Sequence, residues 1–147
     1  MIVPTVNLRV ATPGDAPEIA RLLVMLGYPT EAASLANRWA KWRASGSAAI
    51  VAGGQSAALV GVVTLHTTIV LHRPKPIGRI TALVVDESAR GRGIGRALVA
   101  AAEGAALRDG CGMLEVTSNV RRADAHAFYE RLGYERSSYR FVKVLAE

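Results

Sequence analysis

The 147-residue sequence has one cysteine, three histidines and few aromatic residues. A single thiol, Cys111, cannot form an internal disulfide, so nothing indicates an oxidising compartment. Cys111 and the histidines show no metal-ligand spacing, so we expect no metal site. No uninterrupted apolar run approaches the roughly 20 residues that span a bilayer, and residues 1–5 lack the basic and apolar stretches of a signal peptide. These absences predict a soluble, cytoplasmic protein that does not contact a membrane.

The charge balance is basic, with 18 Lys and Arg residues against 12 Asp and Glu residues and a net charge of +6. Arginine supplies 15 of the 18 cations, and its planar guanidinium suits phosphate and carboxylate partners. The alternative interpretation is a solvated basic surface. We expect no nucleic-acid partner, because the arginines are spread along the chain, only 5% of residues are aromatic and no known DNA- or RNA-binding motif appears.

The length and the 50% apolar content predict that residues 1–147 form one globular domain. Thr12, Pro13 and Asp15 have the spacing of a helix start, with a cap, a first-turn proline and a carboxylate three residues on. The element order predicts a mixed α/β or α+β sheet with helices packed on it. The expected strands are 7–11, 48–52, 57–66, 77–85, 113–117 and one or two over 134–144, and the expected helices are 12–26, 30–45, 96–108 and 122–132.

The most informative stretch is residues 81–98, which predict a strand, a basic glycine-rich loop and the start of a long helix. The first backbone N–H groups of a helix have no partner within it, and the helix dipole adds partial positive charge there. Glycines leave these amides accessible, and arginines beside them add cationic donors. We therefore expect a diphosphate to bind here, with an ordinary strand-to-helix turn as the alternative. The residues are Arg90, Gly91, Arg92, Gly93, Gly95 and Arg96.

Two other glycine-rich motifs do not fit this stretch. A dinucleotide-binding fingerprint needs Gly-x-Gly-x-x-Gly directly after the strand, whereas these glycines alternate and Gly91 follows the strand late. A P-loop needs Lys followed by Ser or Thr after its last glycine, and here Arg96-Ala97 follows. Both motifs are therefore excluded.

Two separated motifs resemble one known family. Arg90-x-x-Gly93-x-Gly95 is similar to the Gln/Arg-x-x-Gly-x-Gly/Ala signature of the GCN5-related N-acetyltransferases, or GNAT family. Asn119 and the segment 125–134, AHAFYERLGY, resemble the Asn…Ala-x-x-Phe-Tyr-x-x-x-Gly-Phe/Tyr segment of the same family. The resemblance covers essentially the whole chain. It implies the GNAT acyl-CoA N-acyltransferase fold, a mixed, mostly antiparallel sheet of six to seven strands flanked by about four helices.

The resemblance implies acetyl-CoA as the co-substrate. In the family the pantetheine arm pairs with the strand before the signature, a backbone amide of that strand polarises the thioester carbonyl, and the signature loop holds the pyrophosphate. Asn119 aligns with a pantetheine contact and Phe128 with an apolar cofactor contact. The implied cofactor-binding residues are Leu83, Val84, Val85, Arg90, Gly91, Arg92, Gly93, Ile94, Gly95, Arg96, Asn119 and Phe128.

Two catalytic residues are implied. Tyr129 aligns with the tyrosine that protonates the departing CoA thiolate, although its spacing with Phe128 and Leu132 also fits a core position. Glu115, on the strand 113–117, aligns loosely with a glutamate that some members use as the base for the attacking ammonium. A water relay, or the absence of a dedicated base, is the alternative.

The predicted activity is direct transfer of the acetyl group to a primary amine in a ternary complex. The alternative is a non-catalytic acyl-CoA-binding regulatory module. The acceptor is a small-molecule or peptide amine, and the basic charge favours acceptors that carry carboxylate or phosphate. Tyr28, Trp39 and Trp42 are candidates to shape its site, with core packing as the alternative for the tryptophans. Many relatives form dimers, and the final strands could provide a homodimer interface.

Overall fold

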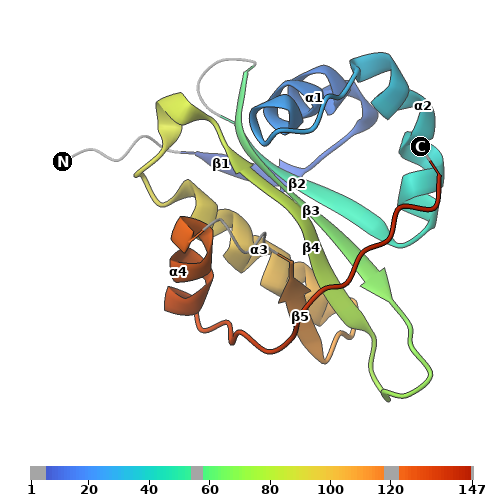
Figure 1. Cartoon of the computed structure of the whole chain (residues 1–147). Coiled ribbons are helices and arrows are strands. Elements are labelled where there is room, and N and C mark those ends of the chain that lie inside the picture. Colours follow the sequence, from blue (N-terminus) through green and yellow to red (C-terminus); the bar gives the residue numbers. More distant parts are fainter. Residues whose placement is uncertain (1–5, 54–57, 118–122, 147) are drawn as a thin grey trace. The chain divides into compact units, whose positions relative to one another are not determined.

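The computed structural model describes residues 6–53, 58–117 and 123–146 (Figure 1). These residues fall into two compact units, Met1–Glu115 and Val116–Glu147. That residues 1–147 form a single domain stays a prediction. The strands are β1 (Asn7–Val10), β2 (Ser47–Gly53), β3 (Leu59–Thr68), β4 (Ile77–Val85) and β5 (Met113–Val116), the α-helices are α1 (Ala16–Met25), α2 (Ala32–Ala44), α3 (Ile94–Arg108) and α4 (Ala123–Arg131), and the short 3-10 helices are η1 (Pro13–Asp15) and η2 (Glu87–Ala89).

The five strands form one sheet in the order β1-β2-β3-β4-β5. Strands β1 to β4 are antiparallel neighbours, as expected for strands that follow one another through turns. β5 starts beside the first residues of β4, because the Gly112 N–H donates to the Pro76 carbonyl over 2.9 Å. Three residues further along both strands, Arg79 pairs with Glu115. Because the residue numbers of β4 and β5 increase in the same direction, β5 is parallel to β4. The sheet is therefore mixed, as predicted.

Within the first unit, helices cover both faces of the sheet (Figure 1). Successive strand residues point to opposite faces, so Val62 of β3 contacts the α1–α2 side while the neighbouring Gly61 contacts Leu98 of α3. The buried cluster on the α1–α2 side includes Ile19, Leu22, Leu35, Trp39, Ala49, Val51, Val62 and Val84.

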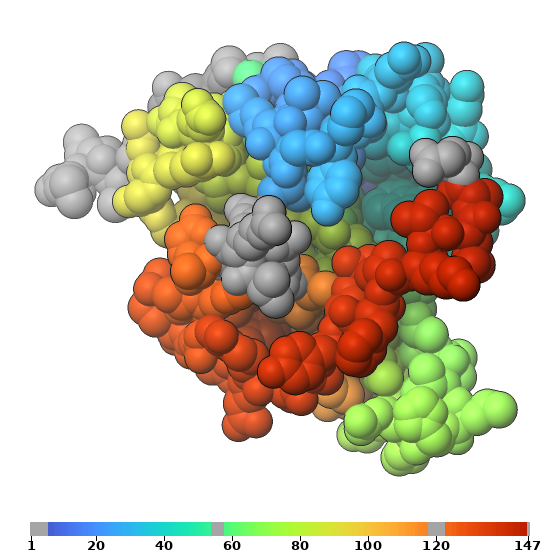
Figure 2. Space-filling view, in the orientation of Figure 1, coloured from blue at the N-terminus to red at the C-terminus, as the bar shows by residue number. Residues whose placement is uncertain are grey.

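The segment between β3 and β4 projects from the first unit (green in Figure 2). It carries Pro74 and Pro76, which cannot donate to a strand ladder. Ile69 and Leu71 in this segment are exposed. The separation of the expected strands 57–66 and 77–85 is confirmed.

The expected strands over residues 134–144 are the main difference from the prediction. Residues 134–146 form neither helix nor strand, so the described sheet has five strands rather than six or seven. The segment has suitable aromatic and β-branched residues, yet Tyr139, Phe141 and Leu145 are exposed. Strand propensity reflects packing on a paired surface, and a segment without such a partner gains little from it. Among the described residues, none of the helices combines the length and apolar character needed to cross a bilayer.

Candidate active site

The second half of β4 has a free edge. β5 has four residues against nine in β4, and it begins beside the start of β4, so it ends near the middle of the longer strand. No other described strand lies beyond β5 or along this edge. On the other edge, Leu83, Val84 and Val85 pair with β3. Apart from the Val85 carbonyl, which accepts from Arg90 Nε, the backbone groups on the free edge of residues 83–85 are therefore available to a ligand that binds like an added strand.

After β4, the short helix η2 and the predicted loop lead into α3. Gly91 and Gly93 have positive φ angles of 80° and 78°, and a Cβ atom built on either would have no other atom within 4 Å. The first intrahelical bond of α3 is donated by the Ala97 N–H to the Gly93 carbonyl. The backbone N–H groups before Ala97 have no acceptor within the helix. They lie in an open turn that contains two glycines. This is the arrangement that the sequence predicted for a diphosphate.

The start of α3 is held close to the sheet by a glycine that the sequence analysis did not single out. Ile94 and Leu98 are buried, and both lie over Gly61 of β3. A Cβ on Gly61 would lie 2.9 Å from Leu98 Cδ1, closer than real contacts allow. Gly61 therefore permits the approach that places the open helix turn beside the end of β4.

The three arginines of the loop are exposed, and one of them folds back. Arg90 Nε donates to the Val85 carbonyl over 3.2 Å, at the end of β4. Arg92 and Arg96 have no hydrogen-bond or ion-pair partner among the described residues. Both are therefore available to an anionic ligand at this turn.

An ion-pair network that the sequence analysis missed ties the start of this loop to α1. Arg21 donates to Asp86 over 2.7 Å and to Glu18 over 3.0 Å, and it also donates to the Leu59 carbonyl. Asp86 in turn accepts from the Ser88 N–H and hydroxyl, which caps η2. The hydrogen bond from Arg21 lowers the pKa of Asp86 to about 2, and the same guanidinium lowers the pKa of Glu18.

We expect the ion pair between Arg21 and Asp86 to stabilise the fold above about pH 4 and to lose this effect in acid. The folded pKa of Asp86 is about 2, below the unfolded value of about 3.9. Its contribution is therefore complete above the unfolded pKa and is lost as the pH falls through the folded pKa. In urea unfolding, Asp86→Asn should be less stable than the wild type at neutral pH, and the difference should shrink between about pH 4 and pH 2. In an Arg21→Gln background this shrinkage should be smaller, because only the Ser88 hydrogen bonds then lower the pKa of Asp86. A difference that does not depend on pH in the presence of Arg21 would contradict the assignment.

Glu115 lies in an ion pair at the β4–β5 boundary. Arg79 Nη2 and Nε donate to Glu115 Oε1 over 2.6 and 2.9 Å. The sequence analysis did not identify Arg79 as the partner of Glu115. A base role for Glu115 stays a prediction, and it would require the carboxylate to accept a proton beside a guanidinium.

The second unit carries the predicted tyrosine on α4. Tyr129 is half-buried, and its ring meets Phe128 edge-on at 5.2 Å between centroids and Tyr134 at 5.7 Å. The helix ends where the Gly133 N–H donates to the Glu130 carbonyl and the Tyr134 N–H to the Tyr129 carbonyl, the closure expected from a glycine in this position. Asn119 lies outside the described residues. The roles of Tyr129 and Phe128 stay predictions.

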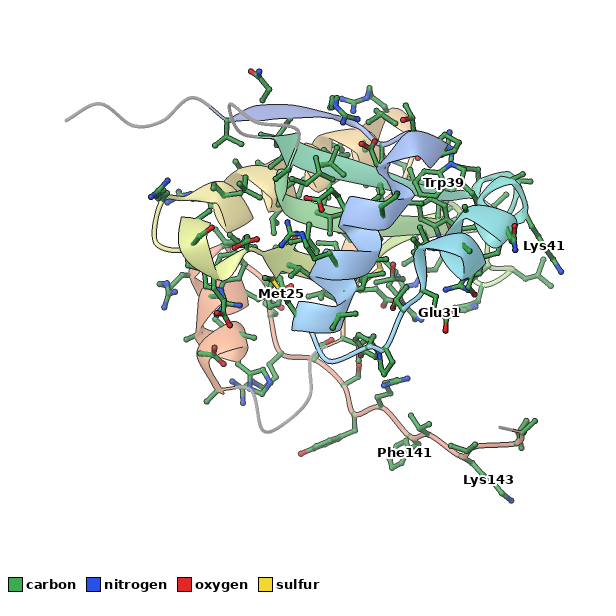
Figure 3. The ribbon with its side chains drawn as sticks, turned by 90° about the horizontal axis from the view of Figure 1, so that it is seen from above. Met25, Glu31, Trp39, Lys41, Phe141 and Lys143 are labelled. Carbon is green, nitrogen blue, oxygen red and sulfur yellow. The ribbon has the colours of Figure 1, made fainter. Side chains whose placement is uncertain are left out.

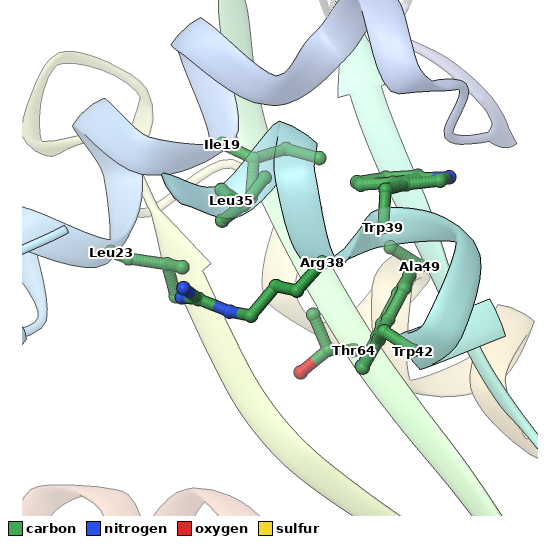
Figure 4. Close-up of a pocket in the computed structure, with 8 residues that line it drawn as sticks. All are labelled: Ile19, Leu23, Leu35, Arg38, Trp39, Trp42, Ala49 and Thr64. Atoms are coloured by element: carbon green, nitrogen blue, oxygen red, sulfur yellow. The ribbon is translucent and has the colours of Figure 1, made fainter. Parts of the chain in front are cut away.

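An apolar pocket of about 180 Å³ lies between α1, α2 and the sheet (Figure 4). Trp39 belongs to the buried cluster and Trp42 packs against it, so the core interpretation of the two tryptophans is confirmed, and both also line the pocket. Tyr28 is exposed and is not among the lining residues. Within the described part of the chain, no group of three or more metal-ligating side chains gathers. The lining residues are Ile19, Leu23, Leu35, Arg38, Trp39, Trp42, Ala49 and Thr64.

Comparison with known proteins decides the family. The model of the "Acetyltransferase (GNAT) family" matches residues 17–134. The chain belongs to the GNAT family of acetyltransferases. The fold agrees, because a crystal structure of a Trypanosoma brucei acetyltransferase superposes with a TM-score of 0.85 at 28% identity, covering 96% of this chain and 100% of that one.

Two curated relatives of this GNAT chain are named N-acetyltransferases. The aminoalkylphosphonate N-acetyltransferase of Salmonella typhimurium is 44% identical over 87 residues, which cover 59% of this chain and 56% of that protein. The aminoglycoside N(6')-acetyltransferase type 1 of Stenotrophomonas maltophilia is 28% identical over 141 residues, which cover 93% of this chain and 91% of that protein. The first match thus spans a little over half of that relative's length.

Proposed function

We propose that this chain transfers the acetyl group of acetyl-CoA directly to a primary amine in a ternary complex. The observation that carries the proposal is the combination of a free strand edge at residues 83–85 with an open helix start at residues 91–96. Coenzyme A and its thioesters carry a strand-like amide arm and a diphosphate in this order, and acetyl-CoA is the thioester that we propose. Membership of the GNAT family supports the same co-substrate.

In this proposal the chain binds the co-substrate mainly through its backbone. The backbone groups that the segment Leu83, Val84 and Val85 presents at its free edge pair with the pantetheine arm, and the amides of residues 91–96 donate to the pyrophosphate. Arg90, Arg92 and Arg96 add charge-assisted donors. Ile94 anchors the helix through its burial, and Asn119 and Phe128 add contacts from the second half of the chain.

The chemical step moves three protons. The attacking ammonium first loses a proton, because only the neutral amine has a lone pair, and Glu115 or a water accepts it. The amine then attacks the thioester carbon, and a strand amide stabilises the oxyanion of the tetrahedral intermediate. Collapse breaks the carbon–sulfur bond, and Tyr129 donates its hydroxyl proton to the departing thiolate. The nitrogen, which became cationic on attack, loses its second proton as the amide forms, and a proton returns to the Tyr129 phenolate directly or through water.

The acceptor is a small-molecule or peptide amine, and we favour a small amine that also carries a phosphonate. The Salmonella relative is named for aminoalkylphosphonates, and the net charge of +6 attracts an anionic acceptor. The Stenotrophomonas relative is named for aminoglycosides, which are polycations and are repelled by the same charge. We also propose that the chain forms a homodimer, and analytical ultracentrifugation of the free protein tests this.

Thiol release in a panel of acceptors tests the proposed function. We expect the chain to release CoA from acetyl-CoA in the presence of 2-aminoethylphosphonate, and to do so more slowly with an aminoglycoside or a lysine peptide. Mass spectrometry should find one added acetyl group on the amine. Binding of CoA by calorimetry without turnover of any amine would instead support a non-catalytic module, and absence of both would overturn the proposal.

A further inference from the structure

The pocket between α1, α2 and the sheet has an apolar wall and one charged side chain. Among the described residues that line it, Arg38 is the single ionisable one, and none is a carboxylate that could neutralise the guanidinium. The tryptophan rings of α2 form much of the wall, with centroids 5.0 Å apart. An apolar cavity with one cationic group suits a small ligand that combines an aliphatic part with an anion.

Arg38 is oriented but not neutralised. Its Nη1 donates to the Ser34 hydroxyl over 2.7 Å, one turn earlier on α2. Its remaining N–H groups have no partner among the described residues. The guanidinium extends from α2 towards Leu23 of α1 (Figure 4). This leaves one side of the planar group available for a two-point contact with an oxyanion.

The pocket is adjacent to the strand that we expect to hold the acetyl group. Thr64 of β3 lines the pocket, and its partner across the sheet is Ala82 of β4, one residue before Leu83. The Thr64 hydroxyl also lies 2.6 Å from the Thr81 hydroxyl on β4. Neighbouring strands are only about 4.8 Å apart, so a short amine in this pocket would lie beside the reacting strand.

We infer that this pocket holds the acceptor and that Arg38 binds an anionic group carried by it, such as a phosphonate or a carboxylate. The inference rests on the proposed function, because it names the residue that selects the acceptor. Arg38 determines specificity and takes no part in the chemical step. The apolar wall covers the methylene groups between the anion and the amine.

The chain reports directly on this pocket, because both of its tryptophans line it. We expect the tryptophan fluorescence of the CoA-bound chain to change saturably with 2-aminoethylphosphonate and with β-alanine, and not with propylamine at the same concentrations. Either order of affinity for the two anions supports the inference and identifies the preferred group. A wild type that binds none of the probes, or binds propylamine equally well, would overturn it.

Two variants of α2 provide a matched pair. Arg38→Gln removes the pocket cation, and we expect its affinity for 2-aminoethylphosphonate to fall by about tenfold or more. Lys41→Gln removes the same charge from the same helix, but Lys41 projects outward and does not line the pocket (Figure 3), so its affinity should match the wild type. Equal losses in both variants would indicate general electrostatic attraction and overturn the assignment of Arg38.

Turnover separates this inference from the proposed function. If the chain acetylates amines, Arg38→Gln should raise the KM for 2-aminoethylphosphonate, with little change in the KM for acetyl-CoA or in kcat/KM for propylamine. A loss that is the same for both amines would count against Arg38. If no amine is acetylated, the proposed function fails, while the fluorescence titration still decides whether Arg38 binds the anion.

Discussion

Tyr129→Phe is expected to reduce kcat by about 100-fold. The variant removes one hydroxyl from a half-buried ring and keeps the edge-on contacts with Phe128 and Tyr134. Without a proton donor, the intermediate must expel a free thiolate, which raises the barrier of the chemical step alone. The loss should therefore appear equally in kcat and in kcat/KM, with an unchanged dissociation constant for acetyl-CoA. Thiol release under saturating co-substrate, together with calorimetry, measures both quantities.

Tyr134→Phe is the matched control for this variant. Its ring contacts Tyr129 at 5.7 Å and is also half-buried, and no catalytic role is assigned to it. We expect this variant to keep the wild-type kcat. Equal rates for the wild type and Tyr129→Phe across the accessible pH range would show that Tyr129 is a core residue, the alternative that its helical spacing leaves open.

Local sequence signals predicted the parts of the fold that depend on neighbouring residues. Asp15 accepts from the Thr12 N–H over 2.8 Å, so the helix start was predicted with the correct partners. The loop at residues 90–93 and the end of α4 at Gly133 follow from glycine positions in the same way. In each case the conformation depends on residues within one turn of the chain, which a sequence displays directly.

Features that depend on distant residues were not predictable in this way. Arg21 lies 65 residues before Asp86, and Arg79 lies 36 residues before Glu115. The chain has 15 arginines, and the sequence does not show which carboxylate each of them pairs with. The exposed segment 139–145 shows the converse, because its residue types indicate a strand while strand formation requires an edge elsewhere in the chain.

Arg38 illustrates why the acceptor could not be predicted from the sequence. The helical pattern placed Trp39 and Trp42 on one face of α2, and both are packed as expected. The same pattern treats Arg38 as an ordinary exposed residue. Its significance comes from the cavity that α1, α2 and β3 enclose together, and that enclosure depends on the packing of three elements rather than on any motif.

Gly93→Ala is expected to weaken acetyl-CoA binding by about tenfold to a hundredfold. Gly93 precedes α3 with φ 78°, a left-handed conformation that costs an L-residue about 1–2 kcal/mol. A Cβ at this position would meet no protein atom within 4 Å. The added methyl group therefore projects into open space, where we place the pyrophosphate, and it would hold the ligand away from the amides. Calorimetry measures the affinity, and urea unfolding measures the cost to the fold.

Gly110→Ala separates the two effects, because Gly110 reproduces the backbone strain at the opposite end of α3. Its φ is 80°, and a Cβ there also meets no atom within 4 Å. Both alanine variants should lower the free energy of unfolding by a similar amount, about 1–2 kcal/mol, but only Gly93→Ala should lose affinity for acetyl-CoA. If both variants lost affinity equally, the loss would follow from destabilisation of α3, and the turn at residues 91–96 would not be the pyrophosphate site. If only Gly93→Ala loses affinity, the open turn itself contacts the co-substrate. The two variants share the same backbone strain and differ only in which end of α3 carries the added methyl group.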